Sequence, residues 1–124
     1  ISHDLGVVAQ LADRVLVMYT GRLMEEAPTR DLFRAPAHPY ARGLLRAVKG
    51  MEAGRRGPLE GIPGVVPDFL ELPEGCTFHP RCPLAERAVG CMDRAPTEVR
   101  LPGTTDGRRA ACFKAEPRPV EVGP

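Results

Sequence analysis

Prolines divide this chain of 124 residues into two parts of different character. Residues 1–50 contain three prolines, whereas residues 51–124 contain eleven. Proline has a fixed φ and no backbone N–H, so it interrupts helices and central strands. The first part can therefore form regular helices and strands. The second part is expected to consist of loops that need another source of order.

Four cysteines lie in the loop-rich part, at positions Cys76, Cys82, Cys91 and Cys112. Their spacing contains no C-x-x-C pair, so it is not that of a zinc finger or a thioredoxin motif. No export signal is visible, which favours a reducing compartment where clustered cysteines more often bind metal than form disulfides. Free thiols, disulfides and a metal site stay open as interpretations. By chemistry alone, zinc is slightly favoured over an iron–sulfur cluster for four thiolates.

The charge balance excludes some classes of partner. Lys and Arg number 17 against 16 for Asp and Glu, which gives a net charge of +1. We therefore expect no nucleic-acid partner, because such proteins carry a basic excess. Apolar stretches such as Val15–Tyr19 are far shorter than the roughly 20 residues that span a bilayer.

The first part alternates between strand and helix patterns. Ile1 and Ser2 read as the end of a strand, and Asp4 can cap a helix that closes near Arg14. The apolar run Val15–Tyr19 predicts a strand buried on both faces. A Thr-Gly turn follows, and then a shorter, more polar strand over Arg22–Glu26.

Less regular elements are expected after the hairpin. A short helix runs from Thr29 to Phe33, and a longer one begins at His38-Pro39-Tyr40 and ends at Gly50, since proline suits the first helical position. Residues 87–92 are expected to carry a little helix.

His3 stands between the first strand and the first helix. Loops at the carboxyl ends of strands are where open α/β sheets bind ligands. The segments Ser2–Val8, Ala12–Val15, Val17–Tyr19 and Gly21–Arg22 closely resemble ATP-binding subunits of ABC transporters. In that family this histidine is the switch histidine, which contacts the γ-phosphate of ATP across a nucleotide-bound dimer. The resemblance therefore implies that His3 is a catalytic and cofactor-binding residue.

Most of the ATP site that this resemblance implies is absent. The sequence contains no Gly-x-x-x-x-Gly-Lys-Ser/Thr phosphate loop. The family's signature motif, Walker B aspartate and catalytic glutamate are expected to lie before Ile1, so the chain is expected to be a fragment. ATP and Mg are therefore expected in a longer parent ATPase, and this chain alone is expected to hydrolyse nothing.

Two further segments refine the resemblance. His38–Leu45 resembles the segment that names the C-terminal region of oligopeptide and dipeptide transporter ATPases. It implies a peptide cargo, with nickel or glutathione as alternatives. Locally, Pro39 starts a helix and Tyr40 packs, so neither His38 nor Tyr40 is expected to be catalytic.

Ile62–Pro67 and Leu72–Pro83 are similar to the C-terminal domain of the same subunits. Some members carry a [4Fe-4S] cluster there, and the resemblance implies a cluster, with zinc as the alternative metal. The implied ligands are Cys76, Cys82, Cys91 and Cys112. Cys112 fits least well, since Gly107–Arg109 replaces an expected Gly-His. His79 is expected to pack rather than bind metal.

The resulting fold prediction is α/β. Residues 1–50 would be the end of a P-loop ABC nucleotide-binding domain, 51–115 a small irregular cysteine domain, and 116–124 a disordered tail. The implied partners are a second ATP-binding subunit and transmembrane permease subunits, at the cytoplasmic face of a bacterial plasma membrane. The alternative is a free-standing metal or iron–sulfur module without ATPase activity. The apolar edge of Val15–Tyr19 speaks against it, because unpaired apolar edges promote aggregation.

Overall fold

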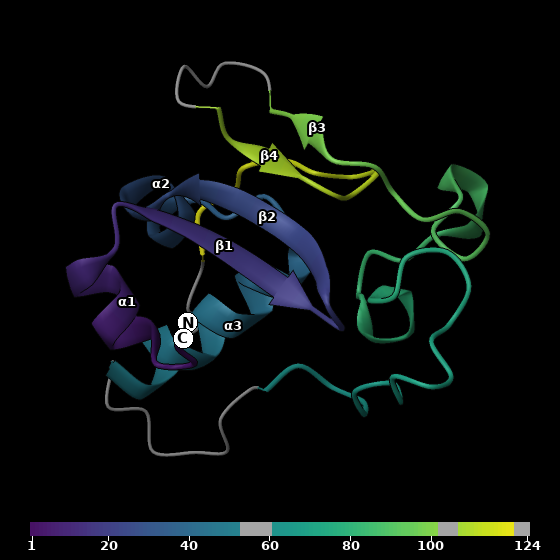
Figure 1. The fold of residues 1–124 in the computed structure, drawn as a ribbon, viewed down its shortest axis with the longest axis horizontal. Coiled ribbons are helices and arrows are strands. Elements are labelled where there is room, and N and C mark those ends of the chain that lie inside the picture. The colour runs from purple at the N-terminus through teal and green to yellow at the C-terminus, as the bar shows by residue number, and fades with distance from the viewer. Residues whose placement is uncertain (53–60, 102–106, 121–124) are drawn as a thin grey trace.

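A computed structural model describes residues 1–52, 61–101 and 107–120 of the chain (Figure 1). The elements, in chain order, are α1 (Leu5–Leu11), β1 (Arg14–Tyr19), β2 (Arg22–Pro28), α2 (Thr29–Arg34), α3 (Pro39–Glu52), the 3-10 helices η1 (His79–Arg81) and η2 (Arg87–Val89), β3 (Val99–Arg100) and β4 (Arg109–Ala110). Helices and strands are mixed, as an α/β prediction requires. The expected strand end at Ile1 and Ser2 is wrong, because no strand forms there.

The strands form one four-stranded sheet in the order β1-β2-β4-β3, with every pair antiparallel. A two-residue turn joins β1 to β2, and its residues Thr20 and Gly21 have φ values of 47° and 74°. Two left-handed residues give the turn the twist that a tight hairpin needs. β2 runs through Pro28 and is longer than the strand expected over Arg22–Glu26.

β1 is buried on one face only, which corrects the prediction that both faces are covered. Val17 and Tyr19 are buried, whereas Leu16 and Met18 on the other face are 55% and 56% exposed. Alternation of this kind is normal for an antiparallel strand with one covered face. The covered face packs on α2 and α3, where Val17 meets Leu32 and Leu45 in the main core.

The helices begin much as their sequences predict. Asp4 caps α1, since its carboxylate accepts a hydrogen bond of 3.0 Å from the backbone N–H of Val7. α3 begins at Pro39 and presents Ala41 and Leu45 to the core. It continues through Gly50 to Glu52, so the expected end at Gly50 is wrong.

An aromatic cluster connects the hairpin to the cysteine-containing part. The ring of Tyr19 lies 4.8 Å from that of Tyr40 and 5.3 Å from that of Phe78, measured between centroids. Tyr40 and Phe78 are also 5.3 Å apart. Phe78 is almost wholly buried, so the loop that carries Cys76 is anchored on the end of the hairpin.

The end of the chain returns to the first half. β4 pairs with β2 through Glu25–Ala110 and Glu26–Arg109. Farther on, the N–H groups of Glu116 and Arg118 donate to the carbonyls of Ala37 and Pro36, at 3.4 and 3.3 Å. Residues 116–120 of the expected disordered tail are thus held against the start of α3, and 121–124 lie outside the described residues. The proposed boundary near residue 50 stays a prediction.

Candidate functional site

His3 lies exposed in the segment that leads into α1. The preceding Ser2 accepts a hydrogen bond of 3.0 Å from the N–H of Asp4, and Asp4 in turn caps the helix. These bonds hold the backbone on both sides of His3 while its imidazole faces solvent. Figure 1 shows α1 and the cysteine-bearing loops well apart, at opposite sides of the hairpin. The structure therefore does not bring His3 and the cysteines into one site.

The four cysteines, by contrast, line a single cavity of about 20 Å³, roughly the space of one water molecule. All four are free thiols. Cys76 and Cys91 are buried, and Cys82 and Cys112 are partly buried. Positions that lie up to 36 residues apart in the sequence are thus gathered around one point. His79, which was expected to pack, also lines this cavity, and its Nδ1 lies 3.0 Å from the carbonyl oxygen of Cys76.

Three of the cysteines begin the same kind of turn. The carbonyls of Cys76, Cys82 and Cys112 each accept a hydrogen bond from the N–H three residues later, at 2.9, 3.1 and 3.3 Å. This fold of the chain directs the N–H two residues after each cysteine toward its sulfur. At Cys112 the bond is explicit, with the N–H of Lys114 3.3 Å from Sγ. Backbone donors aimed at sulfur stabilise the thiolate form.

Burial shifts the pKa of these thiols in the opposite direction to the backbone donors. It is the largest influence on Cys76 and Cys82, whose thiol pKa values it raises, and it raises the pKa of Cys112 to about 11. The neighbouring sulfurs add to the shift, since charges of like sign would repel in the cavity. Burial therefore favours the neutral thiol form of Cys76, Cys82 and Cys112.

The arrangement of the cysteines bears on whether they could hold a metal. Among residues 1–52, 61–101 and 107–120, no three His, Cys, Asp or Glu side chains are arranged to hold one metal ion. The expected metal site is therefore not formed as a single-ion site. Cysteine sulfur is a ligand type of zinc sites and iron–sulfur clusters, and all four cysteines line one cavity. The assignment of the four ligands stays a prediction.

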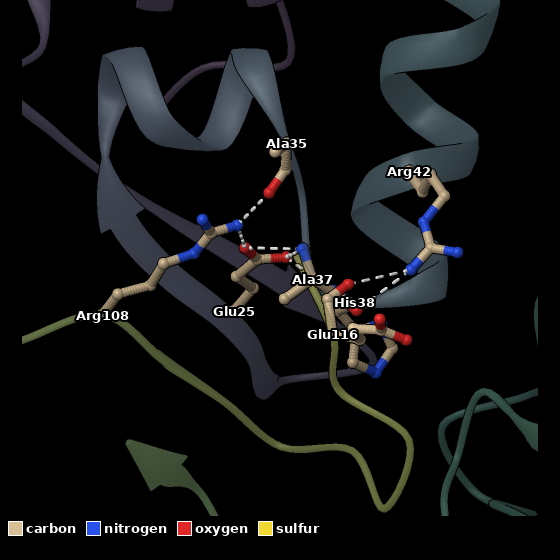
Figure 2. A network of polar contacts seen from close by, with 7 residues as sticks. All are labelled: Glu25, Ala35, Ala37, His38, Arg42, Arg108 and Glu116. Atoms are coloured by element: carbon tan, nitrogen blue, oxygen red, sulfur yellow. Dashed lines mark hydrogen bonds and ion pairs between the residues drawn. The ribbon is translucent and has the colours of Figure 1, made fainter. Parts of the chain in front are cut away.

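A buried ion pair next to this cavity was not anticipated from the sequence (Figure 2). Glu25 is fully buried, and its carboxylate accepts from the N–H of Ala37 at 2.9 Å and of His38 at 2.7 Å. Arg108 donates to the same carboxylate at 2.8 Å and also to the carbonyl of Ala35. In the sequence Glu25 stands next to Glu26 in a polar strand, so no local signal marked it as buried.

His38 is joined to this network through its backbone N–H, which donates to Glu25. Its Nδ1 accepts a hydrogen bond of 3.0 Å from the N–H of Tyr40, and its ring lies 5.8 Å from that of Phe78. Burial lowers the pKa of His38 to about 4, while the backbone of Ala111 partly opposes the shift. The other ring nitrogen, Nε2, is buried and has no hydrogen-bond partner of normal geometry in the described part of the chain. His38 lines the four-cysteine cavity.

Comparisons with known proteins define the class. Residues 24–91, more than half of the chain, match the family model described as "Oligopeptide/dipeptide transporter, C-terminal region". The chain belongs to this family.

Proteins of similar sequence are named as ATP-binding proteins of peptide transporters. An oligopeptide transport ATP-binding protein OppD of Salmonella typhimurium is 49% identical over 98% of this chain. A probable peptide ABC transporter ATP-binding protein of Sinorhizobium fredii is 45% identical over 93% of it. An OppD protein of Mycobacterium bovis is 44% identical over 94% of it. The chain spans 33% of the first two relatives and 18% of the third. In the described part of the chain, no helix has the length and apolar character needed to cross a membrane.

Proposed function

We propose that this chain is part of the ATP-binding subunit of an ABC importer that takes up peptides. The observation that carries the proposal is the 49% identity, over 98% of the chain, to a protein named for oligopeptide transport. The subunit would lie at the cytoplasmic face of the membrane. There it would act with a second ATP-binding subunit and with permease subunits. Nickel and glutathione are the alternative cargoes. A free-standing metal module has no support from the comparisons.

In this proposal His3 contacts the γ-phosphate of ATP that is bound, with Mg, mainly by parts of the longer protein. Its exposure supports the role, because a histidine that reads a phosphate across a subunit interface must be accessible before the interface closes. The hydrogen bonds of Ser2 and Asp4 support it as well, since they restrict the backbone on either side. The groups that position the attacking water are expected outside this chain.

The test is a chimera in which residues 1–120 replace the matching region of the Salmonella relative. Its uptake of labelled peptide should be retained, and His3→Ala in the chimera should abolish uptake while the protein level is unchanged. His79→Gln is the matched control, since it alters a histidine far from α1. A chimera that accumulates normally, yet imports no peptide with His3 intact, would contradict the proposal.

We further propose that Cys76, Cys82, Cys91 and Cys112 hold a [4Fe-4S] cluster, with zinc as the alternative. The three similar turns support it, because each offers a backbone N–H to a sulfur that would carry negative charge. The cluster would supply a structural cross-link between loops that have a small core. The chain itself would provide the four sulfurs and exclude water around them.

Metal analysis of the chain purified without oxygen decides between these possibilities. We expect about four irons and four sulfides per chain and a brown colour, as a four-cysteine cluster implies. One zinc without iron would establish the zinc site instead. Neither metal, in a folded preparation, would overturn both assignments.

A further inference from the structure

A groove of about 760 Å³ lies between α3, residues 61–64 and residues 80–84. Phe78 and Cys82 line both this groove and the four-cysteine cavity, but the other three cysteines do not line the groove. Pockets that bind small molecules commonly measure about 300–1,000 Å³. The groove is therefore of the right size for a small organic ligand.

The walls of this groove are held in place by contacts within the chain. Nε of Arg81 donates to the carbonyl of Pro63, and a terminal nitrogen of the same guanidinium donates to the carbonyl of Ile62, both at 2.9 Å. On its other side, Ile62 packs so closely on α3 that a Cβ at Gly43 would lie 2.7 Å from its side chain. A site that is formed before its ligand arrives loses less conformational entropy on binding.

The charged residues that line the groove are Arg42, Arg46 and Arg81, and no Asp or Glu is among its described lining residues. Arg42 and Arg46 are four positions apart on α3, so their side chains leave the same face of the helix. Arg46 is exposed and makes no hydrogen bond or ion pair within the part of the chain that the structure describes. Its charge is thus available to a ligand.

The chain satisfies the guanidinium of Arg42 only in part. One terminal nitrogen donates to the carbonyls of Ala37 and Glu116, both at 3.3 Å, which is long for a hydrogen bond. Its Nε is buried and has no hydrogen-bond partner among the described residues. Figure 2 shows the remaining nitrogen turned away from the other residues drawn. Arg42 therefore retains donors that the fold does not use.

The pKa of Arg42 reflects the charges around it. Burial lowers this pKa, and the positive charges of Arg118 and Arg46 act in the same direction, whereas the charge of Glu25 raises it. An anion beside Arg42 and Arg46 would offset the repulsion between them.

Apolar side chains make up much of the remaining lining. Ile62 and Leu84 are partly buried there, and Pro80 and Pro83 are exposed. An inorganic ion would leave these side chains in contact with water, whereas the apolar part of a larger ligand would cover them, which is favourable.

We propose that this groove binds a small organic anion. Arg42 and Arg46 hold its carboxylate or phosphate group, since the planar guanidinium matches both kinds of oxyanion. The apolar part of the ligand packs on Ile62 and Leu84. Binding at the groove involves neither His3 nor a metal, so it is independent of the functions proposed above.

The test is calorimetric titration of the full 124-residue chain with hexanoate, hexyl phosphate, inorganic phosphate and hexanol. We expect saturable binding of hexanoate, hexyl phosphate or both. This binding should be at least about tenfold tighter than that of inorganic phosphate or hexanol, because burial of several CH₂ groups adds to the contact with the charged group. Preference for hexanoate would identify the anionic group as a carboxylate, and preference for hexyl phosphate would identify it as a phosphate.

Arg46→Gln should weaken binding of the preferred probe about tenfold, as expected for the loss of one hydrogen bond to a charged group. Arg30→Gln is the matched control, because Arg30 is exposed on α2 and does not line the groove. Since both arginines are exposed, both variants should keep the wild-type circular dichroism spectrum. Equal affinities in the two variants would overturn the proposal. So would a failure of both hexanoate and hexyl phosphate to bind, or inorganic phosphate binding as tightly as hexyl phosphate.

Amide chemical shifts in nuclear magnetic resonance locate the bound probe without any substitution. A saturating concentration of the preferred probe should shift the amides of residues 42–46 and those of Cys82 and Leu84 more than the amides of α1. Shifts that spare residues 42–46 would place the probe elsewhere and contradict the proposal.

Discussion

The ion pair between Glu25 and Arg108 allows a quantitative test of what holds the two halves of the chain together. The side chains are 0% and 4% exposed, and the charged atoms lie 2.8 Å apart. Arg108→Met removes the positive charge but keeps much of the volume. The carboxylate of Glu25 then stays buried and retains only the N–H donors of Ala37 and His38.

Removal of one partner from a buried ion pair typically costs ~3–5 kcal/mol, because the other charge is left uncompensated. The two backbone donors still stabilise the carboxylate, so we expect a loss near the lower end, about 3 kcal/mol of the free energy of unfolding. At a urea dependence of ~2 kcal/mol per molar, this lowers the unfolding midpoint by ~1.5 M. Glu25→Gln combined with Arg108→Met should recover part of the loss, since no unpaired charge remains.

The assay is urea unfolding of the metal-free chain, followed by far-ultraviolet circular dichroism. Arg109→Ala is the matched control: this neighbouring arginine pairs with Glu26 and Glu98 at the surface, where ion pairs contribute little. The variant should unfold near the wild-type midpoint. If Arg108→Met cost no more than Arg109→Ala, the pair would not stabilise the fold and our reasoning about its burial would be refuted.

Three other perturbations have defined outcomes. Because the pKa of His38 falls from 6.5 unfolded to about 4 folded, the metal-free chain should lose up to about 3 kcal/mol of stability as pH falls from 6.5 to 4. His38→Gln should lack that part of the pH dependence in a titration of unfolding; an identical pH profile for the two proteins would contradict it. Gly75→Ala should destabilise the cysteine loops by more than ~1 kcal/mol in the same urea assay, since its φ is +72° and a Cβ would lie 2.6 Å from the carbonyl oxygen of Cys91. Gly21→Ala should lower the stability less, because Gly21 also has a positive φ but an added Cβ would meet open space. Equal losses of stability in the two variants would show that the contact with Cys91 plays no part. In the metal-loaded chain, Cys82→Ser should raise amide hydrogen exchange over residues 76–101 and 107–112 and leave residues 5–45 nearly unchanged, so uniform loosening would argue against a local cross-link.

Local patterns in the sequence were sufficient for much of the first half. The Asp4 cap, the Thr20–Gly21 turn and the start of α3 at Pro39 each depend on the conformational preference of one or two residues. The sequence missed the exposed face of β1, because a continuous apolar run does not say whether a neighbour covers its second face. The end of α3 was also missed, since glycine weakens a helix without always ending it.

For the candidate sites, too, the sequence and the tertiary structure contributed different information. The sequence by itself determined which residues are available: the segment around His3, the segment that begins at His38-Pro39-Tyr40, and four cysteines without a C-x-x-C pair. Only the tertiary structure decided that the cysteines line one cavity apart from His3, that His38 joins them, and that Glu25 meets Arg108 across 83 positions of sequence. The physical reason is that such contacts depend on the path of the whole chain, here the pairing of β4 with β2 and the return of residues 116–118 to α3. Local periodicity and residue spacing do not predict that path.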